Sequence, residues 1–392
     1  MSELYLRYKA ISVFYKTAAE TEPLVSLCEA ADDVSRVEHA ACVFRRVAES
    51  GCGSTGEWIQ KLLERDDNVF SRAAAHGEKI SAALRARVDC ELLTFKQLSL
   101  IGPEKFVSDA TFGFFPMFGY GGMNTNYDRL LRFYARNGCG FVAGGNAFTY
   151  RDGKLKLAEC EPVSLSDLKN YSEEKAEIVR NTENFIKGLP AFHTLLYGDR
   201  GTGKSTTVKA IAHDYRDRLK IIELNKSELS ALPRLFGELS GLKQRYLVFV
   251  DDLSFDEDEQ SADAFKSALE GSLDGASSGN TLVYCTSNRR HLYRERGERS
   301  EKGERRTNDE RQAELALFDR FGLVITYVNP DKGEFIDILK QILRSRGIKW
   351  HDEYAQIAEL AALKKGGRSP RAAKQIADLI ETTKFKEQTP RD

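Results

Sequence analysis

Residues 198–205 constrain the fold of this 392-residue chain more than any other part of it. They read Gly-Asp-Arg-Gly-Thr-Gly-Lys-Ser and fit the pattern G-x-x-x-x-G-K-[ST]. In such a loop the glycines let backbone N–H groups face phosphates. The Lys204 ammonium then meets the terminal phosphates, and the Ser205 hydroxyl meets Mg²⁺. The residues predicted to bind a nucleotide are Gly198, Asp199, Arg200, Gly201, Thr202, Gly203, Lys204, Ser205 and Thr206.

The sequence on either side of this loop supports the same interpretation. Residues 192–197 form a short apolar run that ends at the first glycine. After the loop, Val208, Ile211, Ala212 and Tyr215 recur at the spacing of one helix face. A strand, a phosphate loop and a helix are therefore predicted in this order, whereas a Gly-rich surface turn would need neither flank.

Composition limits the kind of protein. The 58 basic and 59 acidic side chains leave a formal charge of −1, which gives no overall field for nucleic acid or an anionic membrane. The seven cysteines are odd in number and lack C-x-x-C spacing, so they are interpreted as reduced thiols. Residues 1–23 hold no signal-peptide pattern, and no segment approaches the ~18 apolar residues of a membrane span. We expect a cytoplasmic protein with no membrane partner.

The composition and hydrophobic pattern of the sequence change three times along the chain. The predicted segments are a helical N-terminal domain at 1–108, a Gly- and aromatic-rich linker at 109–164, an α/β core at 165–329 and a helical lid at 330–392. Within the linker, 140–143 and 154–157 are predicted to pair as a hairpin. Residues 294–311 alternate in charge and are predicted to form a mobile, solvated insertion in the core.

After residue 191, short apolar segments alternate with helical patterns. This alternation predicts an α/β fold with a parallel five-stranded sheet between helices. The predicted strands are 192–197, 219–224, 246–250, 281–285 and 323–328. Two of them, 246–250 and 281–285, are apolar on both faces, as central strands are. The phosphate loop then lies at the carboxyl end of the first strand, where ligands bind in such sheets.

Polar residues follow two of these strands. Asp251 and Asp252 come directly after 246–250, and Asn288 follows 281–285. Asp251 is predicted to hold Mg²⁺, and Asp252 to polarise an attacking water. Because parallel strand tips open on the same side, Asn288 is predicted to reach the terminal phosphate or the water. A plain turn after each strand is the alternative.

Two arginines extend the pattern. Arg320 lies just before the last strand, where it is predicted to cross to a neighbouring subunit and offset charge in the transition state. Arg371 lies in the first turn of a C-terminal helix and is predicted to touch the nucleotide from above. A surface ion pair for Arg320 and a solvated helix end for Arg371 are the alternatives.

Taken in this order, the segments resemble the AAA+ ATPases, and more closely the uncharacterised AAA+ family catalogued as domain of unknown function 815. The stretches that carry this closer resemblance are 197–205, 250–255, 269–271, 286–292 and 319–322. The resemblance implies that residues 198–205 are Walker A and 246–252 Walker B. It likewise implies sensor 1 at Asn288, the arginine finger at Arg320 and sensor 2 at Arg371. It further implies ATP with Mg²⁺, a ring or filament of subunits, and an adenine pocket lined by 168–171.

The chain departs from the usual AAA+ pattern at two places. Asp252 stands where Glu is usual; its side chain is one methylene shorter, which favours slower turnover. Residues 225–230 lack the aromatic–apolar–Gly loop of threading unfoldases, which argues against a threading pore.

Three alternative functions are consistent with these features of the sequence. The first is an oligomeric ATPase that remodels or loads an unidentified protein or nucleic-acid client, which the N-terminal part would recognise. The second is an ATP-dependent assembly switch or scaffold with little hydrolysis. The third is a small-molecule kinase, for which the Arg-rich stretch 294–311 is the only support.

Overall fold

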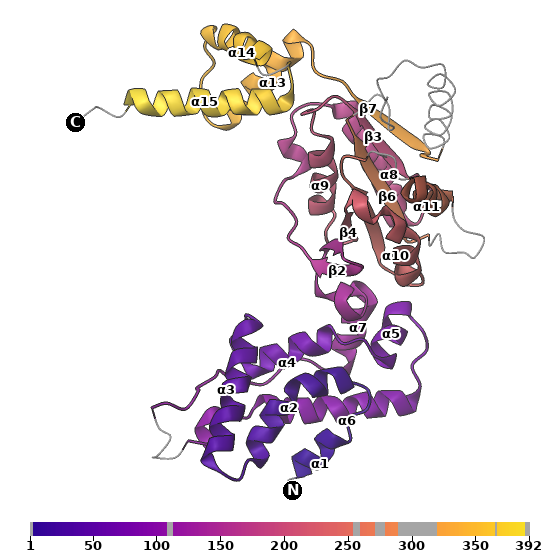
Figure 1. Cartoon of the computed structure of the whole chain (residues 1–392), viewed down its shortest axis with the longest axis vertical. Helices are drawn as coiled ribbons and strands as arrows, with labels where there is room; N and C mark the ends of the chain where they lie inside the picture. Colours follow the sequence, from indigo (N-terminus) through magenta and orange to yellow (C-terminus); the bar gives the residue numbers. More distant parts are fainter. Residues whose placement is uncertain are drawn as a thin grey trace. The chain divides into compact units, whose positions relative to one another are not determined.

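The computed structural model describes residues 3–107, 113–253, 259–270, 279–288, 320–364 and 367–388. They form two compact units (Figure 1). The helical unit comprises Met1–Gly145 and Gly241–Gln244, and the sheet unit comprises Asn146–Ser240 and Arg245–Asp392. The helical unit therefore extends beyond the limit predicted at residue 108. The predicted charged insertion at 294–311 lies outside the described residues.

The helical unit follows the helical patterns of its sequence. Its elements are α1 (Glu3–Lys9), α2 (Tyr15–Glu29), α3 (Asp33–Glu49), α4 (Thr55–Glu64), α5 (Val69–His76), α6 (Ala82–Ser99), η1 (Pro103–Lys105), α7 (Tyr127–Asn137) and η2 (Gly140–Gly144). Aromatic rings fill its centre: Phe70 lies 6.2 Å from Phe14 and 5.7 Å from Tyr134, between ring centroids. Tyr134 lies on α7, so α7 packs with the helices that precede it rather than belonging to a linker.

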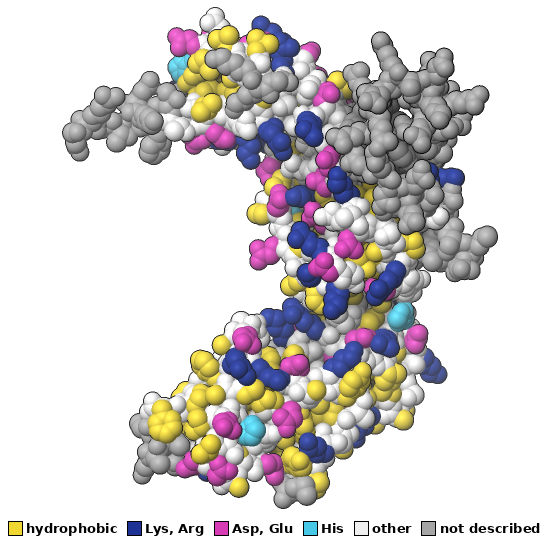
Figure 2. All heavy atoms as spheres, in the orientation of Figure 1, with side chains coloured by type: hydrophobic (Ala, Val, Ile, Leu, Met, Phe, Trp, Pro, Cys, Tyr) yellow, Lys and Arg dark blue, Asp and Glu magenta, His cyan; other side chains and the backbone are white. Residues whose placement is uncertain are grey.

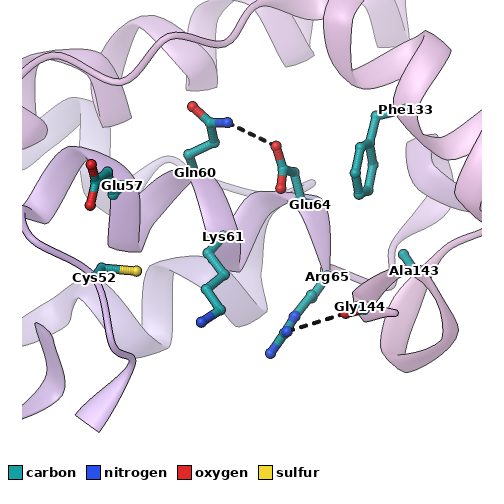
Figure 3. Close-up of a pocket in the computed structure, with 9 residues that line it drawn as sticks. All are labelled: Cys52, Glu57, Gln60, Lys61, Glu64, Arg65, Phe133, Ala143 and Gly144. Carbon is teal, nitrogen blue, oxygen red and sulfur yellow. Dashed lines mark hydrogen bonds between the residues drawn. The ribbon is translucent and has the colours of Figure 1, made fainter. Parts of the chain in front are cut away.

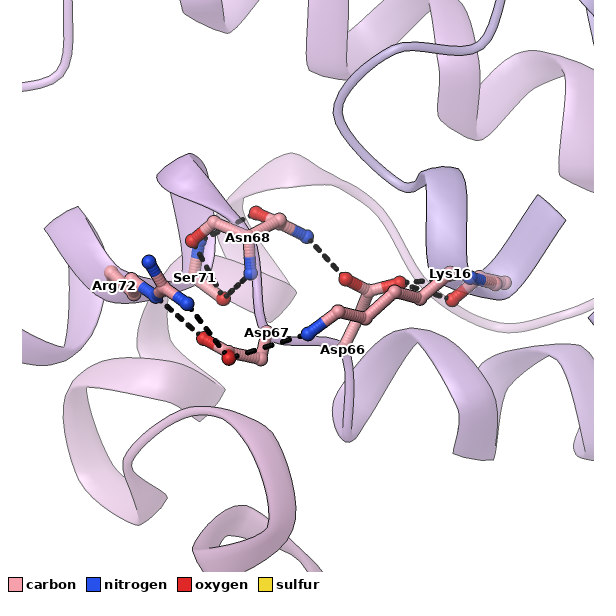
Figure 4. Close-up of polar contacts among 7 residues, drawn as sticks. Lys16, Asp66, Asp67, Asn68, Ser71 and Arg72 are labelled. Carbon is pink, nitrogen blue, oxygen red and sulfur yellow. Dashed lines mark hydrogen bonds and ion pairs between the residues drawn. The ribbon is translucent and has the colours of Figure 1, made fainter. Parts of the chain in front are cut away.

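Two buried carboxylates fasten the start of α2. Asp66 accepts hydrogen bonds from the Thr17 backbone N–H (3.0 Å) and hydroxyl (2.6 Å), and from the Asn68 side-chain amide (2.9 Å). Figure 4 shows this cluster, in which the neighbouring Asp67 pairs with Arg72 and Lys16. The first turn of α2 has N–H groups without helical partners, and Asp66 supplies one acceptor for them.

Glu91 is the second buried carboxylate, and it holds the residues just before α2. Its side chain, on α6, is 1 % exposed. It accepts from the backbone N–H groups of Ser12 (2.8 Å), Val13 (3.1 Å) and Phe14 (3.0 Å), and pairs with Arg87 at 2.8 Å. Glu91 thus ties the chain before α2 to α6 across nearly 80 residues of sequence.

Replacing Glu91 with Ala should destabilise the helical unit by about 3–5 kcal/mol, because three backbone N–H groups, two of them buried, would lose their acceptor and the Arg87 guanidinium its carboxylate partner. The measurement is urea unfolding of the full chain followed by tryptophan fluorescence. The chain has two tryptophans, so a Trp350→Phe background leaves the buried Trp58 as the reporter of the helical unit. Glu38→Ala, at an exposed position of α3, is the control. A midpoint for Glu91→Ala equal to that of the control would contradict this account.

The sheet unit contains a mixed, mostly parallel sheet. Its elements are β1 (Ala147–Arg151), β2 (Lys154–Leu157), η3 (Leu165–Asp167), α8 (Ser172–Lys187), β3 (Thr194–Gly198), α9 (Lys204–Asp214), β4 (Leu219–Leu224), η4 (Lys226–Ala231), α10 (Leu232–Leu239), β5 (Arg245–Val250), α11 (Glu259–Glu270), β6 (Thr281–Ser287), β7 (Leu323–Tyr327), α13 (Lys332–Ser345), α14 (Glu353–Lys364) and α15 (Pro370–Gln388). The strand order is β2-β1-β4-β5-β6-β3-β7. The five predicted parallel strands are confirmed as β3 to β7.

The predicted count of five strands is wrong, because the hairpin joins the sheet. β1 pairs in parallel with β4, and β2 pairs antiparallel with β1, so the described residues form a sheet of seven strands. The predicted position of the first hairpin strand is also wrong. Residues 140–143 lie in η2, and β1 begins at Ala147. The tight turn explains the difference: Asp152 and Gly153 both have positive φ (54° and 71°), and this two-residue turn places the first strand immediately before it.

Helices cover both faces of the sheet. Alternate strand residues such as Leu196, Leu247 and Leu282 share one apolar core with residues of α8 and α9. Figure 1 shows α10 and α11 on the other side of the sheet from α9. The C-terminal helices α13, α14 and α15 form a core of their own around Phe335, Leu339 and Ile376, which confirms the helical pattern predicted after residue 330.

Charges of both signs lie on the face of the molecule shown in Figure 2. Figure 2 shows acidic and basic side chains interspersed on the visible face, as expected from a formal charge of −1. Within the described residues, no helix combines the length and the apolar character needed to span a bilayer.

Candidate functional site

The phosphate loop connects β3 to α9, as the motif predicts. Gly198 has φ of 128°, and a side chain there would overlap the Tyr327 carbonyl oxygen of β7. Gly201 and Gly203 also have positive φ, of 79° and 100°. The glycines therefore serve two purposes. Gly198 admits the neighbouring strand, and the other two let the loop turn into the N-terminus of α9, where free N–H groups attract anions.

Lys204 lies inside this loop. Its side chain is 4 % exposed, and its ammonium donates to the carbonyl oxygens of Gly198 (2.9 Å) and Asp199 (2.6 Å). Burial lowers the pKa of Lys204 to about 8, although Asp199 and Asp251 act in the opposite direction. A phosphate bound in the loop would therefore compete with these two carbonyl oxygens for the hydrogen bonds of the ammonium.

Asp251 joins the loop to two strand tips. At the end of β5, its Oδ1 accepts from the Ser205 hydroxyl at 2.6 Å and from the Thr286 hydroxyl of β6 at 2.5 Å. Ser205 and Asp251, the two predicted metal ligands, are therefore in direct contact. Both present oxygen, the ligand atom that Mg²⁺ prefers. Sequence reasoning missed Thr286 as the second partner of Asp251, although it lies in the polar run that ends β6.

The structure also brings Asp252 and Asn288 together. Asp252 has φ of 52°, uncommon for a residue with a side chain, and its backbone N–H donates to the Thr286 hydroxyl at 3.0 Å. Its carboxylate is exposed and accepts from the Asn288 amide at 2.8 Å. The unusual conformation turns the Asp252 side chain from β5 toward the tip of β6, and such strain is typical of functional positions.

The two predicted arginines lie in different places. The Arg371 backbone N–H donates to the Gly201 carbonyl at 3.2 Å, so α15 begins on the phosphate loop. Arg320 is exposed and precedes β7. In the β3–β7 register, Leu323 is level with Thr194 and Tyr327 with Gly198, which puts Arg320 at the opposite end of the strand from the loop. The structure therefore brings Arg371, but not Arg320, to the loop of the same chain.

The motif does not predict the contacts that tie the loop and Tyr171 to the residues at and after the end of β7. The Asp199 carboxylate accepts from the Asn329 backbone N–H at 3.0 Å, and its own N–H donates to the Tyr327 carbonyl at 3.0 Å. The Tyr171 hydroxyl donates to the Val328 carbonyl at 2.8 Å, and its ring lies 4.9 Å from that of Tyr327. These partners are 128 or more residues apart in sequence, so no local signal indicates them.

A separate hollow of about 410 Å³ lies in the helical unit (Figure 3). Its lining residues are Cys52, Glu57, Gln60, Lys61, Glu64, Arg65, Phe133, Ala143 and Gly144. Its polar groups are largely paired within the unit: Gln60 donates to Glu64 at 2.9 Å, and Lys61 to the Ser50 carbonyl at 2.6 Å. No residue of the predicted site lies in this hollow. In the described part of the chain, no cluster of three or more His, Cys, Asp or Glu could hold a metal ion.

Part of the chain is similar in sequence to known proteins. The chain is 30 % identical over 115 residues to the replication factor C large subunit of Sulfurisphaera tokodaii, covering 26 % of each chain. It is 28 % identical over 127 residues to the Holliday junction branch migration complex subunit RuvB of Prochlorococcus marinus, covering 28 % of this chain and 35 % of the relative. The matches thus span about a quarter to a third of these relatives' length.

A solved structure, the Thermotoga maritima RuvB Holliday junction branch migration motor, aligns with 58 % of this chain and 67 % of its own length. The TM-score is 0.41 and the identity 16 %.

The two curated relatives support the predicted relationship to the AAA+ ATPases. A family model described as "Protein of unknown function (DUF815)" matches residues 145–384, which is more than half of the chain and spans the phosphate loop, the strand tips and α15. The chain therefore belongs to the DUF815 family.

Proposed function

We propose that this protein binds ATP with Mg²⁺ and hydrolyses it within a homo-oligomer to remodel or load a macromolecular client. The observation that carries this proposal is the 2.6 Å hydrogen bond between Ser205 and Asp251. It joins the hydroxyl of the phosphate loop to the acid at the tip of β5, and these are the two groups that hold Mg²⁺ in a nucleotide site of this kind.

The neighbouring residues support binding and hydrolysis in separate ways. Lys204 would leave the loop carbonyls to bind the terminal phosphates, and the Mg²⁺ would neutralise charge on their oxygens. Asp252 would accept a proton from a water whose oxygen attacks the γ-phosphorus, as the bond from that phosphorus to the ADP oxygen breaks. The Asn288 amide, 2.8 Å from Asp252, would keep the carboxylate oriented.

The nature of the client is suggested by the relatives. One is named as a replication factor subunit and another as a subunit of a Holliday junction branch migration complex. We extend this to the proposal that the client is a protein or nucleic-acid assembly. The helical unit, which lies almost entirely outside the segment matched by the family model, would recognise it.

An ATP-dependent assembly switch with little hydrolysis is the second candidate. Asp252 favours it, because this side chain is shorter than Glu and one of its oxygens already accepts from Asn288. In this case ATP would drive assembly without being turned over.

Sedimentation velocity and steady-state hydrolysis, measured on the same samples with and without ATP and Mg²⁺, test the proposal. For the hydrolase, ATP should promote assembly, and the specific rate should rise with protein concentration until assembly is complete. ATP-dependent assembly with no measurable turnover would favour the switch. A monomer that ignores ATP would contradict both candidates.

ATP affinity should weaken at alkaline pH. Because burial lowers the pKa of Lys204 to about 8, the free protein loses the ammonium above pH 8, and ATP then binds only after the lysine regains its proton. The dissociation constant should therefore rise about tenfold per pH unit above pH 8, for as long as the bound lysine stays protonated. Calorimetric titration from pH 7 to 9.5 measures this.

Lys204→Arg is the control for this pH dependence, because an arginine stays charged throughout the range. It should bind ATP less tightly but with a flat profile. An equally flat profile for the unmodified protein would contradict the role of Lys204.

A further inference from the structure

Asp199 links the phosphate loop to the chain that leaves the sheet. Its backbone N–H donates to the Tyr327 carbonyl, and its carboxylate accepts from the Asn329 backbone N–H, both at 3.0 Å. One residue of the loop thus holds the last residue of β7 and the second residue beyond it. An ionised carboxylate that accepts from an N–H makes a stronger bond than a neutral acceptor.

The segment held by Asp199 leads directly into the C-terminal helices. Between them, the Val328 carbonyl accepts from the Tyr171 hydroxyl. Two residues after Asn329, Asp331 caps α13 by accepting from the Glu334 backbone N–H at 2.8 Å. Residues 328–331 are therefore a short connection with one end fixed by Asp199 and Tyr171 and the other by a helix cap.

The C-terminal helices meet the phosphate loop at a second point. The Gly201 carbonyl accepts from the Arg371 backbone N–H at 3.2 Å. The Ser369 hydroxyl lies 3.0 Å from the position a Cβ on Gly201 would take. The loop therefore contacts both the start of α15 and the connection before α13. A change in the conformation of the loop would alter both contacts.

Lys204 connects these contacts to a bound phosphate. Its ammonium donates to the Asp199 carbonyl at 2.6 Å and to the Gly198 carbonyl at 2.9 Å. A phosphate that draws the ammonium away takes one hydrogen bond from each carbonyl, while the Asp199 carbonyl keeps its bond from the Thr202 hydroxyl at 2.9 Å. Asp199 is thus the residue whose carbonyl loses the ammonium and whose carboxylate holds the Asn329 N–H.

We infer that Asp199 is a positioning residue that couples the state of the phosphate loop to the connection at 328–331. This inference rests on the proposed binding of ATP. The Asp199 carboxylate already accepts from the Asn329 N–H, so the nucleotide contact predicted for Asp199 would come from its backbone, which a side-chain substitution keeps. Removing the carboxylate should therefore weaken the response of the C-terminal helices to a saturating concentration of ATP.

Hydrogen exchange at single-residue resolution, with and without ATP and Mg²⁺, tests this inference on the full chain. In Asp199→Ala without nucleotide, the Asn329 amide should exchange about tenfold faster than in the unmodified protein, because one charge-assisted hydrogen bond is lost. ATP should change exchange across 328–345 more in the unmodified protein than in Asp199→Ala. The ATP dissociation constant of each protein is measured first, so that the two proteins are compared at a saturating ATP concentration.

Two variants separate this role from a general structural one. Asp199→Asn keeps an acceptor oxygen and should restore most of the protection of the Asn329 amide. Asp337→Ala removes an exposed carboxylate of α13 that pairs with Lys340, and it should leave exchange at Asn329 unchanged.

Unchanged exchange at Asn329 in Asp199→Ala would overturn the inference even if ATP binds. If the unmodified protein failed to bind ATP, the proposed function would fall and the coupling with it. The nucleotide-free comparison would still report on the Asp199–Asn329 hydrogen bond.

Discussion

Replacing Asp252 with Asn should leave ATP binding intact and lower the rate constant of hydrolysis by about 10²–10⁴-fold. The carboxylate is exposed at the tip of β5, turned by its φ of 52° toward Asn288, and it is the group proposed to accept the proton of the attacking water. An amide of the same size keeps the shape and removes the base. Single-turnover hydrolysis and equilibrium binding, measured separately, give the two quantities.

Asp252→Glu and Asp337→Asn are the matched variants. Asp252→Glu restores the residue usual at this position and should turn over at least as fast as the unmodified protein. Asp337→Asn makes the same chemical change on the surface of α13 and should have no effect. Equal single-turnover rates for Asp252→Asn and the unmodified protein would mean that Asp252 is not the base.

Replacing Arg320 with Ala should lower turnover in the assembled protein by about 10³–10⁵-fold without loss of ATP binding. Arg320 lies at the opposite end of β7 from Gly198, which favours action on a neighbouring subunit rather than on its own loop. Steady-state hydrolysis at a protein concentration where assembly is complete measures the effect.

A mixing experiment tests whether Arg320 acts between subunits. Arg320→Ala subunits keep an intact phosphate loop, and Lys204→Ala subunits keep Arg320. Each variant alone should be inactive, whereas a mixture should recover part of the activity at the mixed interfaces. If Arg320→Ala alone turned over normally, or if no mixture recovered activity, the shared site would be wrong.

Local patterns were sufficient to predict the loop at 198–205 and the strands around it. The loop at 198–205 needs particular residues at fixed spacing, and the strands β3 to β7 are short apolar runs between turn residues. Because parallel strand tips lie at one edge of a sheet, the pairing of Ser205 with Asp251 and of Asp252 with Asn288 follows from topology alone.

What the sequence could not predict depends on contacts between distant residues. Residues 140–143 are apolar enough for a strand but form η2, because the Asp152–Gly153 turn fixes β1 immediately before it. β1 pairs with β4 because β4 would otherwise be an edge strand with unpaired backbone groups. No local sequence pattern indicates which strand lies at the edge. The Asp199–Asn329 and Glu91–Phe14 bonds likewise join residues 130 and 77 positions apart.

The most direct test of the nucleotide site is calorimetric titration of ATP, with and without Mg²⁺, into the unmodified protein and into Lys204→Ala. The account predicts one Mg²⁺-dependent site per chain, and an affinity at least about 100-fold weaker in Lys204→Ala, because a buried charge contact to phosphate is lost. No binding to the unmodified protein, or equal affinity in the two proteins, would contradict it.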